Sequence, residues 1–422
     1  MTTAVSAETM LTAEQLQDDL RAWMEWVAET HPKLDYTTDL ETLDATVESL
    51  SAKLNGQYTP REAWLALSVL NPLFSDAHVG LRYPERRYQA AVRAGGVEFS
   101  APVRVQEGRL FVADTIGPKS VLQPGDQIIA INAIPAATIV HSLMIRMRGE
   151  TDTLRSFILS TRFSGALWAL TGNAEEYTVD VMRSGEPLTG LRLHPDRDAV
   201  DQPPVPFNFS IVDDVAVLKV DSFDRSLEAE FLAFLESSFQ AITDSGSRHV
   251  VVDLRENGGG AEELSSPLMT YLTDQRIASL SEITARITAE NQALIPGASL
   301  GDVVSVPFEN WIEPTATLAN RFEGEVFILV GPNTYSQSIV FAAAAQDAGI
   351  AKIVGRPTEG AVNQTGQVQR FELPESGLLA LAPIYMFTRA SGETGRSPLM
   401  PDMTLAGEGD EQLELLIARI VE

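Results

Sequence analysis

The chain of 422 residues contains no cysteine. This absence excludes a thiol nucleophile, a disulfide framework and a metal site built from thiolates. The chain also lacks an uninterrupted apolar run long enough to span a membrane, so no membrane insertion is expected. Its N-terminus has no basic segment followed by an apolar stretch, which a leader sequence needs. The Val-Ser-Ala segment at residues 5–7 is either the remnant of a cleaved leader or part of a disordered start.

Positive charge is scarce as well. The chain has 31 lysines and arginines against 58 aspartates and glutamates, which gives a formal net charge of −27. A surface this acidic repels phosphates, so neither nucleic acid nor an anionic membrane surface is an expected partner. Hydrophobic residues nevertheless make up 44% of the chain. That proportion over this length predicts a substantial core and more than one domain.

The first part of the chain has helical patterns. Residues 12–15 have the form of a capping box, apolar residues follow at helical spacing, and His31 with the next proline ends the pattern. A second amphipathic helix is expected between residues 40 and 54. A third begins at Thr59, which is followed by a proline and, three residues on, by a glutamate. Residues 1–90 are therefore predicted to form an N-terminal helical cap domain.

From about residue 91 the pattern changes to short strands. Residues 125–132 read as a turn that runs into a strand, and a closing hairpin is expected around Ser184 and Gly185. A helical stretch is predicted between residues 139 and 170. We expect a β-rich domain over residues 91–200, followed by a linker at residues 201–204, where two prolines occur.

The last part, residues 201–422, alternates strands with helices. Residues 250–254 and 326–330 are nearly all apolar, which is typical of parallel strands covered on both faces. Helices are expected at about 261–272 and 336–348. This alternation predicts an α/β fold with a parallel sheet, in which ligands gather at the carboxyl ends of the strands.

Two segments whose residues can take part in catalysis follow predicted strands. Gly258, Gly259 and Gly260 come after the first strand, and such a segment can present backbone N–H groups to a developing negative charge. A flexible turn is the alternative. Ser336 comes after the second strand at the start of a helix, where it can act as a nucleophile. The alternative there is an ordinary helix-capping serine.

Together and in this order, the two segments resemble the tail-specific, or C-terminal-processing, serine peptidases, a family that includes the catalytic core of the tricorn protease. Residues 353–360, 371–378 and 401–402 extend the resemblance over most of the chain. The resemblance implies a Clp-protease/crotonase-like α/β core with an N-terminal helical bundle and an inserted PDZ-like domain. Residues 125–132 carry the similarity to the PDZ-like domain.

The resemblance also implies roles for individual residues. Ser336 corresponds to the nucleophile, with Ser338 as the less favoured choice. The backbone N–H of Gln337, with that of Gly258 or Gly259, would form the oxyanion hole. The best-known members carry a lysine base 25 positions after the serine, but this chain has Ala361 there.

A different base is therefore needed. Lys352 precedes a strand and is not expected to reach the serine. His78 lies in an Asp-Ala-His-Val segment, residues 76–79, which resembles the Asp-Gly/Ala-His-Thr loop of the Ser–His branch. Imidazole suits the acceptance of a serine proton near neutral pH. The alternative for His78 is a loop histidine that caps or packs, while His249 and His31 are expected to be structural.

A third group should orient the imidazole. In the Ser–His branch this is a glutamate shortly before the C-terminal Pro-Asp, and the corresponding position here is near Gly395. Glu393 is the nearest carboxylate and is taken as the third catalytic residue. Asp76, Glu256 and Glu359 are rival candidates.

The sequence therefore predicts a serine peptidase that acts through an acyl-enzyme on a peptide or protein substrate, without metal or organic cofactor. The resemblance implies a periplasmic or secreted location and leaves the oligomeric state open. One alternative is a catalytically inactive peptide- or ligand-binding protein on the same scaffold, favoured by Ala361 and by Val79 in place of threonine. Another is a serine hydrolase of non-peptide esters or amides.

Overall fold

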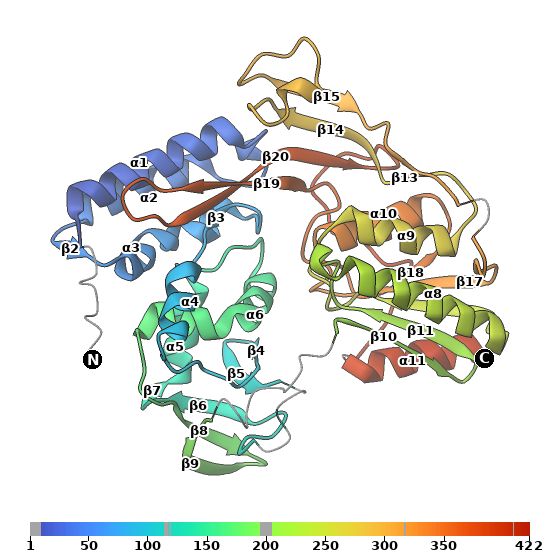
Figure 1. Cartoon of the computed structure of the whole chain (residues 1–422), viewed down its shortest axis with the longest axis horizontal. Helices are drawn as coiled ribbons and strands as arrows, with labels where there is room; N and C mark the ends of the chain where they lie inside the picture. The colour runs from blue at the N-terminus through green and yellow to red at the C-terminus, as the bar shows by residue number, and fades with distance from the viewer. Residues whose placement is uncertain (1–9, 114–116, 118–119, 195–204, 316–317, 408) are drawn as a thin grey trace. The chain divides into compact units, whose positions relative to one another are not determined.

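The chain forms two compact units. The computed structural model describes residues 10–113, 117, 120–194, 205–315, 318–407 and 409–422. The first unit contains the described residues up to 194 together with Arg286–Asp302 and Gln367–Ile384. The second contains residues 205–285, Val303–Gly366 and Tyr385–Glu422 (Figure 1). Each unit is therefore built from segments that are separated in sequence.

The predicted division at 1–90, 91–200 and 201–422 stays a prediction. No local pattern indicates that the segments at 286–302 and 367–384 pack with the N-terminal half of the chain. The possible leader remnant at residues 5–7 and the linker at 201–204 lie outside the described residues.

The three helices predicted for the first ninety residues are confirmed. Helix α1 (Ala13–Thr30) begins at a capping box, in which Thr12 accepts a hydrogen bond from the backbone N–H of Gln15, and ends at His31. Asp39 caps the N-terminus of helix α2 (Leu40–Lys53), and Thr59 caps that of α3 (Pro60–Leu67). Short 3-10 turns η1 (Leu34–Tyr36) and η2 (Ser68–Phe74) follow α1 and α3, respectively.

The first unit also contains an antiparallel sheet with the strand order β4-β5-β6-β8-β9. Its strands are β4 (Val103–Gln106), β5 (Arg109–Val112), β6 (Gln127–Ile131), β8 (Thr178–Arg183) and β9 (Glu186–Arg192), with β7 (Ile134–Pro135) paired to β6. The predicted hairpin is confirmed, because β8 and β9 are joined at Ser184 and Gly185, which have φ angles of 51° and 87°.

The helical stretch predicted over residues 139–170 is interrupted. The structure has two helices, α5 (Ala136–Met144) and α6 (Asp152–Thr171). Gly149 between them has a φ of 133°, which no helix accommodates, and Thr151 caps the second helix. Helix α4 (Glu85–Arg93) also belongs to this unit.

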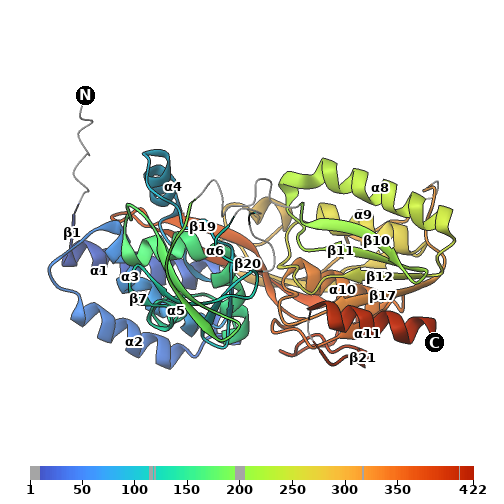
Figure 2. The same cartoon turned by 90° about the horizontal axis from the view of Figure 1, so that it is seen from below.

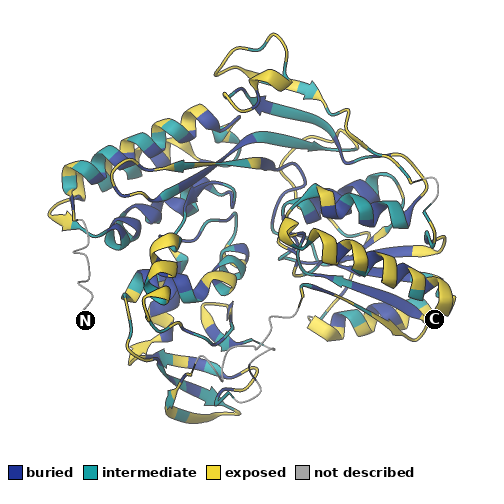
Figure 3. Ribbon diagram, viewed as in Figure 1, coloured by how far each residue is buried: buried dark blue, intermediate teal, exposed yellow. Residues whose placement is uncertain are grey.

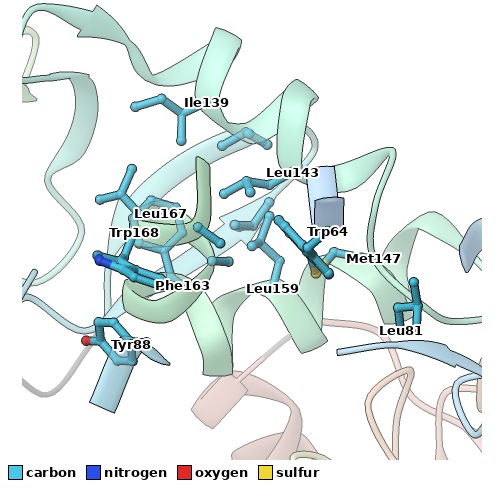
Figure 4. Packing of buried hydrophobic residues seen from close by; sticks show 14 of the residues in the cluster. Trp64, Leu81, Tyr88, Ile139, Leu143, Met147, Leu159, Phe163, Leu167 and Trp168 are labelled. Carbon is cyan, nitrogen blue, oxygen red and sulfur yellow. The ribbon is translucent and has the colours of Figure 1, made fainter. Parts of the chain in front are cut away.

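Helices α3, α5 and α6 contribute to one hydrophobic core. Figure 4 shows Trp64 of α3, Leu143 of α5 and Leu159, Phe163 and Leu167 of α6 in this cluster, in which all five are buried. Burial of side chains of this size contributes about 1.5–3 kcal/mol each to folding. This core joins segments that the sequence analysis assigned to separate domains.

The second unit is organised around a sheet with the strand order β10-β11-β12-β17-β18-β21. The strands are β10 (Phe207–Val212), β11 (Val215–Val220), β12 (His249–Asp253), β17 (Glu325–Val330), β18 (Lys352–Gly355) and β21 (Met403–Thr404). The predicted parallel pairing is confirmed for β11, β12, β17 and β18. The antiparallel edge strand β10 was not predicted.

Helices cover both faces of this sheet. Figure 2 shows α8 (Glu228–Ser245) and α9 (Glu262–Leu272) on one side and α11 (Gly409–Val421) on the other. Helix α10 (Gln337–Asp347) packs beside α9. Because both faces are covered, the central strands are buried along nearly their whole length (Figure 3).

The remaining strands are short or antiparallel. Strand β14 (Leu280–Arg286) pairs with the second half of β20 (Leu379–Arg389), and β3 (Gly80–Leu81) pairs with the first half. The others are β1 (Leu11–Thr12), β2 (Gln57–Tyr58), β13 (Ile277–Ala278), β15 (Val303–Pro307), β16 (Trp311–Ile312) and β19 (Thr365–Glu372), with a 3-10 turn η4 (Gln292–Leu294) between β14 and β15 and η3 (Arg225–Leu227) before α8.

A buried carboxylate ties α1 to the turn between β19 and β20. Asp19 is 0% exposed. Its Oδ1 accepts the backbone N–H of Glu375 at 2.8 Å, and its Oδ2 accepts that of Ser376 at 2.9 Å. These charge-assisted bonds join residues more than three hundred positions apart, and losing the carboxylate would leave both N–H groups without their acceptor.

We therefore expect Asp19→Ala to lower the free energy of unfolding by about 3 kcal/mol, because a hydrogen bond to a charged group contributes about 1.5–3 kcal/mol. The measurement is urea unfolding followed by tryptophan fluorescence. The matched control is Asp18→Ala, since the Asp18 side chain is half-exposed and pairs with Arg21 on the same helix. Equal unfolding midpoints for the two variants would contradict the assigned role.

Candidate active site

Ser336 has an unusual backbone conformation. It lies between β17 and α10 with φ 54° and ψ −125°. Such angles cost a non-glycine residue about 1–3 kcal/mol and persist only where the surroundings enforce them, most often at functional sites. The serine side chain makes no capping hydrogen bond to the helix. The alternative reading of Ser336 as an ordinary capping residue is therefore not what the structure shows.

Several hydrogen bonds hold this turn. The carbonyl oxygen of Ser336 accepts the N–H of Ile339 at 2.9 Å and the side-chain amide of Gln364 at 3.0 Å. Two residues earlier, the hydroxyl of Thr334 donates to the carbonyl of Leu254 at 2.8 Å. Thr334 and Gln364 are both buried. The serine turn is thus anchored both to the end of β12 and to the segment before β19.

Asn257 joins the glycine segment to the serine turn. Its side-chain nitrogen donates to the carbonyl of Val220 at 3.0 Å, and its Oδ1 accepts the N–H of Gly259 at 2.9 Å. Its backbone carbonyl accepts the N–H of Tyr335 at 3.0 Å. Asn257 is fully buried. This one residue, through its side chain and its backbone carbonyl, connects the ends of β11 and β12 with the residue directly before Ser336.

Two of the three glycines are required by close contacts. Gly259 has a φ of 99°, and a Cβ there would lie 2.7 Å from the Cβ of Ser336. Gly260 has a φ of 141°, and a Cβ there would lie 2.1 Å from the carbonyl oxygen of Phe223. Both distances are shorter than real contacts allow. The segment is therefore a fixed backbone wall beside the serine rather than a flexible turn.

Backbone N–H groups remain available next to the serine. Gln337 is the first residue of α10, and neither its N–H nor that of Gly258 has an acceptor among the residues that the structure describes. The N–H of Gly259 is already used by Asn257. Helix N-termini and free N–H groups stabilise negative charge, so this end of the sheet suits an oxyanion.

His78 lies in the first unit, in the loop between η2 and β3. Its Nδ1 is 3.2 Å from the Oδ1 of Asp76, which also accepts the backbone N–H of His78 at 2.7 Å. The Asp76 side chain is 2% exposed and that of His78 is 11% exposed. The imidazole is therefore oriented by a buried carboxylate two residues before it.

The ionised form of Asp76 is strongly favoured. Burial acts to raise the pKa of Asp76, but its interactions with His31 and His78 outweigh this effect and hold the pKa well below its usual range. A carboxylate next to imidazole Nδ1 keeps the proton on that nitrogen. The Nε2 of His78 is then the basic atom.

The loop that carries His78 is clamped from two sides. The guanidinium of Arg148 donates to the carbonyl of Ala77 at 2.5 Å. The side chain of Asn71 accepts the N–H of Leu81 at 2.7 Å and donates to its carbonyl at 2.9 Å. At Gly80 a Cβ would meet the Asn71 side chain at 2.5 Å, so glycine lets this clamp close.

The structure gives Glu393 a different environment. Its side chain is 69% exposed, and one oxygen lies 3.4 Å from the guanidinium of Arg389. Asn363 fixes the backbone of this loop, because its amide donates to the carbonyls of Glu393 and Gly395 at 2.9 and 2.8 Å. The assignment of Glu393 as the orienting acid stays a prediction.

The other candidates are also located. Ser338 is fully buried in α10, and Lys352 forms an exposed ion pair with Glu325 at the opposite end of the parallel strands from Ser336. Glu256 accepts a hydrogen bond from Asn333, while burial raises its pKa.

Among the described residues no group of three or more His, Asp or Glu side chains is arranged to hold a metal ion, and no helix is long and apolar enough to cross a bilayer.

The sequence analysis missed Asn257 and Gln364. Asn257 directly precedes the three glycines, which is the one local signal that could have drawn attention to it. Gln364 lies 28 positions after the serine whose carbonyl it binds. Nothing in its own neighbourhood in the sequence marks that contact.

Comparisons with known proteins indicate a family. Residues 214–405 match the family described as Peptidase family S41. A carboxyl-terminal-processing protease from Picosynechococcus sp. is 23% identical over 360 residues, which cover 83% of this chain and 74% of that protein.

Solved structures share the fold. Mature CPAF complexed with lactacystin aligns with a TM-score of 0.64 and 14% identity over 97% of each chain. The photosystem II D1 C-terminal processing protease aligns with a TM-score of 0.51 and 17% identity, covering 96% of this chain and 97% of that one. The family match over residues 214–405 and the curated relative support a serine-type peptidase related to the tail-specific proteases, and the solved structures show that the fold is shared.

Proposed function

We propose that Ser336 is the nucleophile of this peptidase and that it forms an acyl-enzyme with a peptide substrate. The observation that carries the proposal is the enforced turn at Ser336, φ 54° and ψ −125°, at the N-terminus of α10 with the backbone of Gly259 against it. The serine Oγ attacks the peptide carbonyl, the amine leaves with a proton, and water then hydrolyses the ester.

His78 is the general base in this proposal. Its Nε2 takes the proton of the serine hydroxyl and later gives it to the leaving amine. Asp76 is the acid that orients it, supported by the 3.2 Å distance between the Asp76 Oδ1 and the His78 Nδ1. Asp76 was a rival candidate from the sequence. It is preferred to Glu393 because the Glu393 carboxylate is exposed and lies beside Arg389.

The oxyanion is held by backbone N–H groups in this proposal. Gln337 and Gly258 are the preferred donors, since neither N–H has an acceptor among the described residues. Gly259 is the less suitable of the two predicted glycines, because its N–H already donates to Asn257. Its contribution is instead the space that a side chain would fill.

The finer architecture is proposed on the same basis. The parallel sheet with α10 after β17 supports a Clp-protease/crotonase-like core, and the antiparallel sheet β4-β5-β6-β8-β9 with α5 supports a PDZ-like domain that binds an extended peptide. The helices α1, α2 and α3 correspond to the N-terminal bundle. A periplasmic or secreted location remains part of the proposal, and cell fractionation tests it.

The nucleophile and base are tested by covalent labelling with a fluorophosphonate. We expect no labelling of Ser336→Ala and a labelling rate lowered about 1,000-fold or more in His78→Ala, as for members of a catalytic triad. Ser338→Ala is the matched control and should label like the wild type. Mass spectrometry of the labelled peptide locates the adduct.

An adduct on any residue other than Ser336 would refute the assignment of the nucleophile. Unchanged labelling of His78→Ala would refute the assignment of the base. Turnover of a peptide anilide compared with a simple ester then tests whether peptides are the substrates.

The identity of the orienting acid is tested by comparing Asp76→Asn with Glu393→Gln. We expect Asp76→Asn to slow labelling about 100-fold or more, because the asparagine no longer favours the proton on the Nδ1 of His78. Glu393→Gln should stay within about threefold of the wild type, since an exposed ion pair contributes little. The reverse ranking would assign the acid to Glu393.

The backbone wall is tested with Gly259→Ala. The new Cβ would meet the serine at 2.7 Å, so we expect the labelling rate to fall about 100-fold, the scale of losing one oxyanion-hole interaction. Gly246→Ala is the control, because Gly246 also has a positive φ, 71°, but no atom lies within 4 Å of the added Cβ. Equal labelling rates for the two variants would show that the contact at Gly259 is not needed.

A further inference from the structure

A second buried histidine faces the carboxylate that orients His78. The Nε2 of His31 lies 3.9 Å from the Oδ2 of Asp76, while His78 is bound to the other oxygen, Oδ1. The side chain of His31 is 0% exposed. The sequence analysis assigned His31 only to the end of the first helix. It does end α1, but its ring points toward Asp76.

The tautomer of His31 follows from its other ring nitrogen. The Nδ1 accepts the backbone N–H of Lys33 at 3.1 Å, so in the neutral ring the proton is on Nε2. That Nε2 is buried and has no hydrogen-bond partner among the described residues. A buried N–H without a partner is costly, which favours a small movement that closes the 3.9 Å gap to Asp76.

The ring of His31 is fixed through its backbone. Its N–H donates to the carbonyl of Val27 at 2.9 Å, in the last turn of α1. Its carbonyl accepts two bonds from the guanidinium of Arg286, at 3.1 and 3.2 Å. The backbone of His31 is therefore held rigidly beside the loop that Arg148 binds.

We infer that His31 is a positioning residue, which donates its Nε2–H toward the Oδ2 of Asp76 and so keeps the Oδ1 directed at His78. The inference rests on the proposed role of His78 as the base. A carboxylate can rotate about its Cβ–Cγ bond. A donor on one oxygen and the imidazole on the other select a single orientation. When His78 accepts the serine proton, its positive charge then meets an oxygen already in place.

Arginine side chains bind the backbone at or beside these three residues. The ring of His78 and that of His31 flank Asp76, and the guanidinium groups of Arg148 and Arg286 bind the carbonyls of Ala77 and His31. Both guanidinium groups bind backbone oxygens in these contacts, and both imidazoles act to lower the pKa of the Asp76 carboxylate.

The test compares His31→Phe with His31→Gln. Phenylalanine keeps a ring of similar size but has no donor, while the amide of glutamine reaches about as far as Nε2 and keeps one. We expect the maximal rate of fluorophosphonate labelling to fall about 10–100-fold in His31→Phe with unchanged affinity for the reagent, since misplacing a catalytic group by 1 Å can cost about 100-fold. His31→Gln should recover to within about threefold of the wild type.

A spectroscopic signal reports the same contact without catalysis. In protein labelled with 15N-histidine, the Nδ1–H of His78 should give a low-field proton resonance from its bond to Asp76. The chain has five histidines, so assignment by single His→Gln variants is practical. We expect this resonance to shift or disappear in His31→Phe and to be restored in His31→Gln. The same result is expected when these changes are made in the wild type and when they are made in Ser336→Ala.

The outcomes separate the two proposals. An unchanged resonance and labelling rate in His31→Phe, with labelling lost in His78→Ala, would overturn the role of His31 and leave the proposed base intact. Normal labelling of His78→Ala would overturn the proposed base, and the resonance would still decide whether His31 orients Asp76. If His31→Phe does not fold, His31→Asn removes the donor while its oxygen can still accept the N–H of Lys33.

Discussion

The backbone at Ser336 is the constraint on which the candidate site depends. A backbone with φ 54° and ψ −125° costs a non-glycine residue about 1–3 kcal/mol. The second unit meets that cost with buried polar contacts from Asn257, Thr334 and Gln364. Glycine at position 259 gives the backbone room to pass close to the serine. The parallel sheet brings these segments together, because the carboxyl ends of its strands share one edge.

A different constraint applies in the first unit, which buries an ionised carboxylate. Asp76 is almost fully buried, and isolated burial of such a charge is very unfavourable. His78 and His31 flank its two oxygens, and the N–H of His78 adds a third interaction. The same contacts that make the charge tolerable also fix an imidazole and its tautomer. Stability of the loop and orientation of a base are thus two consequences of one arrangement.

Local patterns in the sequence were sufficient to predict many of the helices and the parallel strands. Capping boxes and apolar runs located the helices and the parallel strands, because each signal lies within a few residues of the feature it marks, whereas Ser336 was singled out by the resemblance to a family. Gln364, Asn257 and the contact of His31 with Asp76 were missed, since each depends on residues brought together only by folding. The same holds for Asp19, whose partners lie 356 and 357 positions away. The broken helix at Gly149 was missed for another reason, because helical spacing continues on both sides of the break.

In the proposed mechanism, the alanine at position 361 makes a base other than lysine necessary. Ala361 is buried, and its backbone is bridged to Pro398. A lysine base needs desolvation of its amine to lower its pKa, and a buried position next to the serine provides that. An imidazole already has a suitable pKa and needs a defined tautomer and orientation instead. A lysine base therefore needs a buried amine, whereas a histidine base needs an imidazole held in one orientation. Hydrogen bonds from Arg148 and Asn71 hold the loop around His78 in the way that an oriented imidazole requires.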